Sequence, residues 1–320
     1  MSAASHVPVM LQEVMEHLAI PSGGAALDLT LGLGGHAQGL LSGADGKASY
    51  LGVDRDGQAI SFALQRLEND KRFSALASAY EDVWETAEFK EWAVAHAPDG
   101  LDVILADLGV SSFQLKTSAR GFSFMAEGPL DMRMDSERGL TALEWLSQQT
   151  EDSLAEALSK YGEERASRPI SRAILQALKN GTLSTTLDLA RSVYTVLPRE
   201  IAMRKKQIDP ATRTFQAIRI AVNSELVGLG ATIEKAVSAL KTWGRIGFIS
   251  FHSLEDRIVK QAFRRLAGIY DGPGREAPSV LPKLLRLISP GGIVPGEAER
   301  NSNPPSRSAR LRLAQRVPCT

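Results

Sequence analysis

One stretch near the start of the chain constrains the fold more than any other. Ala25 to Leu29 is mostly apolar, three of the four residues 32–35 are glycine, and Ala37 to Leu41 fits a helix. A strand, a glycine turn and a helix in this order form the ligand cradle of many α/β proteins. Glycine is needed where the backbone takes a positive φ or closely approaches a ligand. The stretch therefore predicts a small-ligand cradle.

The same alternation continues through the first 112 residues. Apolar runs at 50–54, 73–77 and 101–107 predict three further strands, and helices are expected from Asp56 to Leu67 and over 82–96. Such a pattern predicts a parallel sheet covered by helices on both faces, with ligands bound outside the carboxyl ends of the strands. Asp54, Tyr80 and Asp107 fall at these ends, on the same edge as the glycine turn.

The rest of the chain is organised differently. Residues 113–135 show no clear period although they are rich in Gly, Phe, Met and Arg, and residues 136–208 have a helical pattern. We therefore predict an α/β core in two parts, 1–135 and 209–320, around an inserted all-helical domain, 136–208. The second part is expected to contain helices at 210–223 and 225–241, a strand at 244–251, a helix ending near Leu266, and a final strand pair at 284–288 and 309–313.

Composition excludes several classes of protein. The chain is 43% hydrophobic and 23% charged, and no apolar run approaches the roughly 20 residues of a membrane helix. The N-terminus does not resemble an export signal. Its single cysteine, Cys319, excludes an intrachain disulfide framework and a cysteine-based zinc site. These features predict a cytoplasmic protein without a membrane partner.

Charge is balanced overall but not locally. The chain has 37 Lys and Arg against 37 Asp and Glu. Arg199 to Arg219 contains six cations and two acids, and Arg300 to Thr320 contains five arginines and no acid. Such stretches are typical of a polyanion partner, and equally of solvated helix faces.

The glycine turn leaves two adenosine cofactors open. Gly32-Leu-Gly-Gly35 is not the complete G-x-G-x-x-G of a dinucleotide site, whereas Asp54 has the spacing of a carboxylate that binds a ribose diol. Asp28, just before the turn, favours S-adenosylmethionine, because it can reach the ammonium group of that ligand or order the loop. His36 is either a ligand contact or a polar residue that the start of the helix accommodates.

Two further positions have alternative interpretations. Asp107 can hydrogen-bond an acceptor amine and orient its lone pair toward a sulfonium methyl group, or it can cap the next loop. Ser111 and Ser112 have no His-Asp pair at a familiar spacing, which excludes a serine hydrolase. His252 and Asp256 are four residues apart at a helix start, where they either form a metal pair or catalytic dyad, or support the helix and a loop.

These motifs together resemble the bacterial small-subunit ribosomal RNA methyltransferase H family. The resemblance covers nearly the whole chain in the right order, through the segments His6-Val-Pro-Val9, Gly34-Gly-His36, Val53-Asp-Arg-Asp56, Asp107-Leu-Gly-Val-Ser-Ser112 with Gln114, Arg120-Gly-Phe-Ser-Phe124, Gly128-Pro-Leu-Asp-Met-Arg-Met-Asp135, Tyr161-Gly-Glu-Glu-Arg165, Pro210-Ala-Thr-Arg-Thr-Phe-Gln-Ala217, Arg219-Ile-Ala-Val-Asn223, Ile249-Ser-Phe-His-Ser-Leu-Glu-Asp-Arg-Ile-Val259 and Ser306-Arg-Ser-Ala-Arg-Leu-Arg312.

The resemblance implies a class I methyltransferase fold, Rossmann-like with a mostly parallel sheet, that transfers a methyl group from S-adenosylmethionine to N4 of a cytidine in 16S rRNA near the ribosomal P site. It implies no metal. Asp107 is the implied catalytic residue, and the implied cofactor contacts are Gly34, Gly35, His36, Asp54, Tyr80, Asp107 and Gln114. Three positions depart from the family pattern: Tyr80 stands for the usual Phe, Leu29 for Gly and Pro305 for Arg. The first keeps an aromatic ring, and the last weakens an RNA-contact interpretation there.

The implied partner is 16S rRNA or the small ribosomal subunit. A cytidine in structured RNA must leave its stack to reach the methyl donor. We expect residues 113–135 and Arg199 to Arg219 to hold RNA around it, and the long insertion allows a homodimer. Two rivals are a methyltransferase for DNA or protein amines and a non-catalytic RNA-binding assembly factor. The residues after Asp107 lack the Pro-Pro-Tyr/Phe typical of amino-directed DNA enzymes, and the intact cradle disfavours the second.

Overall fold

The protein divides into two compact units. The computed structural model describes residues 7–204, 208–269 and 283–318. The first unit comprises Met1–Gly109 and Val227–Thr320, and the second comprises Val110–Leu226.

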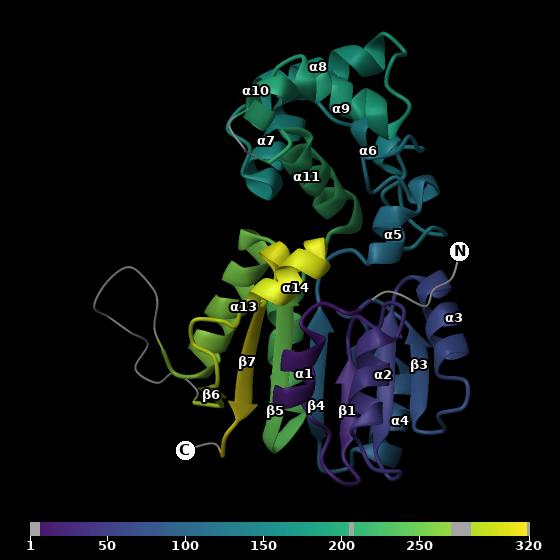
Figure 1. Ribbon diagram of the computed structural model, residues 1–320, viewed down its shortest axis with the longest axis vertical. Coiled ribbons are helices and arrows are strands. Elements are labelled where there is room, and N and C mark those ends of the chain that lie inside the picture. The colour runs from purple at the N-terminus through teal and green to yellow at the C-terminus, as the bar shows by residue number, and fades with distance from the viewer. Residues whose placement is uncertain (1–6, 205–207, 270–282, 319–320) are drawn as a thin grey trace. The chain divides into compact units, whose positions relative to one another are not determined.

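The first unit is built on a seven-stranded sheet in the order β3-β2-β1-β4-β5-β7-β6 (Figure 1). Five neighbouring strands are parallel: β1 (Ala25–Asp28), β2 (Ser49–Asp54), β3 (Phe73–Ala77), β4 (Leu101–Asp107) and β5 (Leu240–Ser250). β7 (Arg310–Arg316) runs antiparallel to both β5 and β6 (Leu285–Leu287). The predicted α/β fold with a mostly parallel sheet is therefore confirmed. The strand order reverses between β1 and β4, which is where open α/β sheets bind ligands.

Helices cover both faces of this sheet because its strands are apolar on both faces. Ala26 packs with α1 (Leu11–His17), α2 (Gly35–Ser42) and α3 (Gly57–Arg66). The next residue, Leu27, packs with α4 (Ala87–His96), α12 (Leu229–Ala239) and α13 (Ser253–Leu266). All four residues of β1 are buried, as expected for a strand in the middle of a parallel sheet.

Three sequence predictions for this unit were wrong in detail. The helix expected over 82–96 is a 3-10 turn, Val83–Glu85, followed by α4, because Thr86 takes an extended backbone and caps α4 by accepting a hydrogen bond from the Phe89 amide. α12 begins at Leu229, later than the expected residue 225. β5 begins at Leu240, earlier than the expected residue 244. The connector before β7 contains a helix, α14 (Glu297–Ser302), whose sequence has no apolar stripe to reveal it.

The second unit is helical and larger than the predicted insertion. It contains α5 (Ser112–Lys116), a 3-10 turn at Ser118–Arg120, α6 (Ala142–Ser147), α7 (Glu151–Gly162), α8 (Ser167–Lys179), α9 (Thr186–Tyr194), α10 (Arg199–Arg204) and α11 (Ala211–Asn223). Its boundaries lie outside the expected 136–208, because Leu130, Met132 and Phe215 belong to the same hydrophobic core as the helices between them. Thr141, Thr150 and Thr185 each close a capping box that marks a helix start.

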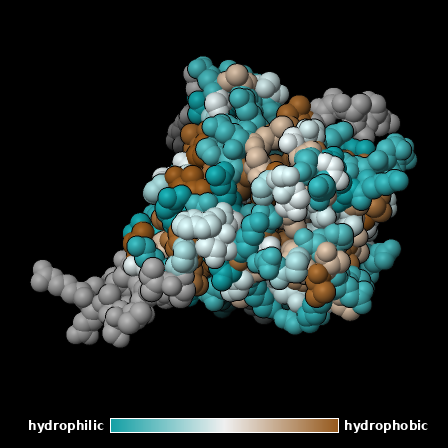
Figure 2. Space-filling model, turned by 90° about the horizontal axis from the view of Figure 1, so that it is seen from below, coloured by the Kyte–Doolittle hydropathy of each residue, from teal (hydrophilic) through white to brown (hydrophobic). Residues whose placement is uncertain are grey.

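The face of the molecule seen in Figure 2 is mixed in character. Figure 2 shows mainly hydrophilic residues with separate hydrophobic ones between them. None of the helices in the described parts of the chain combines the length and the apolar composition that crossing a bilayer requires.

Gly34 is a glycine of the cradle that combines a positive φ with close packing against α3. Its φ is +74°, and a Cβ atom would lie 3.0 Å from Cβ of Ala63 on α3. We expect Gly34→Ala to lower the free energy of unfolding by about 1–3 kcal/mol, because it adds both backbone strain and overpacking. Urea denaturation followed by circular dichroism measures this.

Gly57→Ala is the matched control, because Gly57 is exposed at the start of α3 and has open space around its Cα. We expect that variant to unfold within about 0.5 kcal/mol of the unmodified protein, or to be more stable. Equal losses in the two variants would contradict this account of Gly34.

Candidate cofactor and acceptor site

Three strands of the first unit end in an aspartate. Asp28 ends β1, Asp54 ends β2 and Asp107 ends β4, and all three strands are parallel. The carboxyl ends of parallel neighbours lie at one edge of a sheet. These carboxylates are therefore expected at the carboxyl ends of β1, β2 and β4, where the strand order reverses. The sequence predicted Asp54 and Asp107 at this edge, and Asp28 just before the turn.

Asp28 orders the turn that follows it. It is 1% exposed, and its carboxylate accepts hydrogen bonds from the Thr30 amide at 3.0 Å and from the Tyr50 hydroxyl at 2.9 Å. Burial raises the pKa of Asp28 from 3.8 to about 6, although these hydrogen bonds and His36 lower it. Of the two roles expected for Asp28, ordering the loop is the one that these contacts support.

Asp54 holds the glycine turn from the neighbouring strand. One oxygen accepts a hydrogen bond from the Gly32 amide at 2.7 Å, and the other accepts one from the Asp56 amide at 2.9 Å. Burial raises the pKa of Asp54, and the two amides oppose that rise. Each carboxylate oxygen retains capacity to accept a further hydrogen bond, as a ribose diol would require.

Packing within the protein explains why two positions of the turn are glycine. Gly34 faces Ala63 of α3, and a Cβ at Gly35 would lie 2.4 Å from Cγ of Pro8. Close packing therefore explains why both positions exclude a side chain. Gly32, with φ +52°, has only the Thr30 carbonyl within 4 Å of a would-be Cβ, at 4.0 Å, so its backbone is open on that side.

Buried His36 lies beside half-buried Asp107 in this region. His36 Nε2 lies 3.5 Å from Asp107 Oδ2, and the Asp107 amide donates a hydrogen bond of 2.5 Å to the Thr30 hydroxyl. Within the described structure, Asp107 Oδ1 and both ring nitrogens of His36 are buried without a hydrogen-bond partner. Buried polar atoms without partners are costly, so they indicate a place for a polar ligand. The alternative role of Asp107 as a loop cap is not what its contacts show.

Tyr80 lies three residues beyond the end of β3 and is half-buried. The guanidinium of Arg55 is 5.7 Å from the centre of its ring, and the same guanidinium hydrogen-bonds both oxygens of Glu81 at 3.1 and 3.2 Å. These contacts fix the ring after β3, where an adenine contact was expected.

Gln114 belongs to the second unit. It is 5% exposed, its Oε1 accepts a hydrogen bond from the Ser111 amide at 3.0 Å, and the Ser111 hydroxyl accepts one from the Gln114 amide at 3.2 Å. The two residues close a capping box at the start of α5. This contact accounts for Gln114 structurally, and its expected contact with the cofactor stays a prediction.

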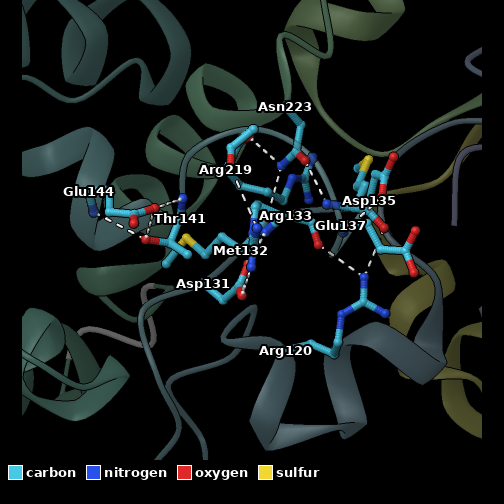
Figure 3. Close-up of polar contacts among 12 residues, drawn as sticks. Arg120, Asp131, Met132, Arg133, Asp135, Glu137, Thr141, Glu144, Arg219 and Asn223 are labelled. Atoms are coloured by element: carbon cyan, nitrogen blue, oxygen red, sulfur yellow. Dashed lines mark hydrogen bonds and ion pairs between the residues drawn. The ribbon is translucent and has the colours of Figure 1, made fainter.

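The irregular segment of the second unit is held in one conformation (Figure 3). Met132 has φ +59°, and the Asn223 side chain bridges it by accepting from the Met134 amide and donating to the Met132 carbonyl, both at 2.7 Å. Buried Arg120 donates to the carbonyls of Arg133 and Met134 at 3.0 and 2.9 Å. A Cβ at Gly128 would lie 1.9 Å from the Ser118 carbonyl oxygen, so glycine is required there. These motif residues therefore build the loop.

Several cations of the two basic stretches are used within the protein. Arg199 pairs with Asp209 at 2.8 Å, and Arg219 makes two 2.8 Å hydrogen bonds to buried Glu225. In the C-terminal stretch, Arg312 pairs with Asp256 and Arg316 donates to carbonyls at the end of α12. Lys205 and Lys206 lie outside the described residues, and Arg204 is exposed. Sequence charge alone therefore overstated the cations available to a polyanion.

In the described structure, His252 and Asp256 contact other residues and not each other. His252 caps α13, with its Nδ1 accepting from the Glu255 amide at 3.4 Å, and Asp256 accepts from Arg312 at 2.6 and 2.9 Å. His252 Nε2 also lies 3.2 Å from Glu255 Oε1, in an alignment that makes no hydrogen bond. The structural interpretation is therefore supported. In the described segments, no group of three or more His, Cys, Asp and Glu is placed to hold a metal ion.

Two residues of the site were missed by the sequence analysis. Thr30 accepts from the Asp107 amide, 77 residues away, and Tyr50 donates to Asp28 across neighbouring strands. Neither contact has a local sequence signal. For Tyr50 the pairing of β1 with β2, Ala26 opposite Tyr50, could have indicated that the tyrosine reaches the end of β1.

Comparison with known proteins finds relatives that match nearly the whole chain. The model of the MraW methylase family matches residues 3–317. The chain is 43% identical over 317 residues to a protein of Hydrogenovibrio crunogenus named ribosomal RNA small subunit methyltransferase H, a match that covers 98% of this chain and 97% of that protein. Proteins of the same name from Acinetobacter baumannii and Nitrosococcus oceani are 44% and 42% identical, over 98% of this chain and 98% and 97% of their own lengths.

The raised pKa of Asp28 predicts a specific dependence of stability on pH. Because its pKa is about 6 in the folded protein and 3.8 as the ordinary value, the folded state binds the proton more tightly. Stability from this group is therefore greatest below about pH 4 and is lost as pH rises through about 6. The stability of Asp28→Asn relative to the unmodified protein should rise from pH 4 to pH 7 by about 2–3 kcal/mol.

Asp45→Asn is the control, since hydrogen bonds from Ser22 and the Gly23 amide lower the pKa of exposed Asp45. Its relative stability should change in the opposite direction, falling as the pH rises toward 4. Chemical denaturation at several pH values measures both differences. A difference for Asp28→Asn that does not change with pH would contradict the assignment.

Proposed function

The chain belongs to the MraW methylase family, and we propose that it methylates N4 of a cytidine in 16S rRNA near the ribosomal P site. Family membership makes it an S-adenosylmethionine-dependent methyltransferase acting on ribosomal RNA, as the sequence predicted. The observation that carries the finer assignment is the Asp107–His36 pair. Its buried atoms without partners lie near the carboxyl ends of β1 and β4, where the strand order reverses.

The described residues fit S-adenosylmethionine. Asp54 is placed to accept hydrogen bonds from the ribose, and Tyr80 to pack against the adenine. The open backbone at Gly32, with Gly34, Gly35 and His36 after it, leads to the methionine end of the ligand. Asp28 and Asp107 give this end negative charge, which suits a ligand with an ammonium and a sulfonium group. Gln114 completes the proposed set of contacts.

The cofactor supplies a methyl group that its positive sulfur already activates. The protein therefore has to position the acceptor and exclude competitors. An exocyclic amine donates hydrogen bonds, and Asp107 Oδ1 is a buried acceptor with no other partner in the described structure. A hydrogen bond to this oxygen would turn the nitrogen lone pair toward the methyl carbon. Cytidine N4 is the amine that the sequence resemblance implies.

Recognition of the RNA is assigned mainly to the second unit. Residues 113–135 contain part of α5, a 3-10 turn and a loop whose backbone Asn223 fixes around Met132, and they are suited to hold a base that has left its stack. Exposed Arg204 and the neighbouring Lys205 and Lys206 are the proposed phosphate contacts. We place the reaction in the cytoplasm on the small ribosomal subunit. A homodimer stays a prediction that sedimentation velocity can check.

Asp107→Asn should lower kcat by about 10²–10³-fold while leaving the affinity for S-adenosylmethionine within a few-fold. The amide keeps the shape of the side chain but loses the negative charge next to the reacting amine. Transfer of labelled methyl groups to unmethylated 30S subunits measures kcat, and isothermal titration calorimetry measures the affinity.

The same transfer assay separates the rival functions when naked rRNA, DNA and protein are offered in parallel. Label in a single rRNA cytidine supports the proposal. Label in DNA or protein amines would replace it, and no transfer to any substrate would favour a non-catalytic assembly factor.

Charge reversal of Arg204, Lys205 and Lys206 to Glu should weaken binding to rRNA by at least 10-fold. Each phosphate contact that is lost removes released counterions, so the salt dependence of binding should also become less steep. Calorimetry should show an unchanged affinity for S-adenosylmethionine. A loss of cofactor affinity with normal RNA binding would show that this stretch is not the RNA contact.

A further inference from the structure

We propose that His36 is the proton acceptor of the reaction and takes the proton of the acceptor amine by way of the Asp107 carboxyl group. This inference rests on the function proposed above, because it concerns the proton that N-methylation releases. It gives His36 a role in the chemistry in addition to its expected contact with the cofactor.

The two oxygens of Asp107 have different surroundings. Oδ2 lies 3.5 Å from His36 Nε2, whereas Oδ1 is buried and has no hydrogen-bond partner in the parts of the chain that the structure describes. The backbone of Asp107 is held at the end of β4, since its amide donates to the Thr30 hydroxyl at 2.5 Å. Oδ1 therefore has unused capacity to accept a hydrogen bond from an amine, while Oδ2 faces an imidazole.

His36 is unusually placed for a residue with only a packing role. It is 6% exposed, and neither of its ring nitrogens has a hydrogen-bond partner among the described residues. Buried polar atoms that make no hydrogen bond destabilise the folded protein. A neutral imidazole has one nitrogen that accepts a proton. The proposal requires the tautomer with its proton on Nδ1, in which Nε2 is the accepting nitrogen and faces the Asp107 carboxyl group.

The charges around His36 favour the product of such a transfer. Asp107 from β4 and Asp28 from β1 both lie near it: burial is the largest cause of the raised pKa of Asp28, which His36 lowers and Asp107 raises. From β2, Asp54 is engaged by the Gly32 and Asp56 amides. The opposing charges are the N-terminus of α2 and Arg66 of α3, whose Nη1 would lie 3.4 Å from a Cβ at Gly35.

The proton transfer balances without another reactant. The N4 lone pair bonds to the methyl carbon while the electron pair of the breaking C–S bond stays on sulfur, so N4 gains a positive charge. One N4 proton then moves to Asp107 Oδ1, and nitrogen keeps the electron pair of that N–H bond. Rotation about the terminal bond of the aspartate, a broad torsion, presents the proton to His36 Nε2. The result is a neutral methylated amine and an imidazolium beside two carboxylates.

His36→Gln tests the proposal, with His17→Gln as a matched control in the last turn of α1. We expect His36→Gln to lower kcat on 30S subunits by about 10²-fold at saturating S-adenosylmethionine, a loss that any weakening of the affinity for the cofactor, measured by calorimetry, does not explain. His17→Gln should change neither quantity. A loss of cofactor affinity that fully accounts for the loss of activity would show that His36 is only a ligand contact, and would overturn the proposal.

The pH dependence of kcat gives a readout that a structural role would not alter. In the unmodified protein kcat should fall on the acidic side as the proton acceptor becomes protonated, and His36→Gln should remove this decline. A decline that persists in His36→Gln, which Asp28 could cause, would overturn the proposal. In His36→Ala, added imidazole should restore part of kcat, and an absence of rescue in a folded variant would count against it.

The unmodified protein keeps the proposal falsifiable if the variants do not fold. A kcat that is independent of pH across the range in which histidines titrate, roughly pH 5 to 8, would overturn it. Failure of the proposed function is distinguishable, since the unmodified protein would then transfer no methyl group to any 30S cytidine. An active enzyme with unaltered kcat in His36→Gln would overturn the role of His36 alone.

Discussion

The turn after β1 is held by hydrogen bonds from three different strand ends, and the arrangement of the site depends on them. Asp28 accepts from the Thr30 amide, Asp54 accepts from the Gly32 amide, and Thr30 in turn accepts from the Asp107 amide. These contacts join β1, β2 and β4 around one short loop. Backbone groups of a glycine-rich turn have little conformational preference of their own, so side chains from the neighbouring strands fix them.

Burying the carboxylates of Asp28 and Asp54 has an electrostatic cost, which a cationic ligand would reduce. Burial raises the pKa of both Asp28 and Asp54, because carboxylates in the sheet edge lose much of their hydration. Their hydrogen bonds to amides recover part of this loss. A cationic ligand would recover more, so a site that is unfavourable when empty favours a methyl donor with an ammonium and a sulfonium group.

Many residues in the family-like motifs stabilise the fold, and fewer are left for chemistry. Arg120 and Asn223 fix the backbone around Met132, and Arg312 pairs with Asp256 behind the cap that His252 forms on α13. Arginine suits such positions because its planar group can satisfy several buried acceptors at once. Asp107 and His36 differ from Arg120, Asn223 and Arg312, since Asp107 Oδ1 and both ring nitrogens of His36 are buried without a hydrogen-bond partner in the described structure.

The sequence by itself determined the alternation of strands and helices, the aspartates at the strand ends and the family, because apolar periodicity and motif spacing are local properties of the chain. Only the tertiary structure decided which residues meet. The contacts of Tyr50 with Asp28 and of Thr30 with Asp107 span 22 and 77 residues. The sequence also could not show that Arg219 and Arg312 form ion pairs with Glu225 and Asp256, or that residues from 110 to 226 belong to one unit. Charge and glycine content are read along the chain, whereas pairing, burial and close packing are set by strand order and by the core.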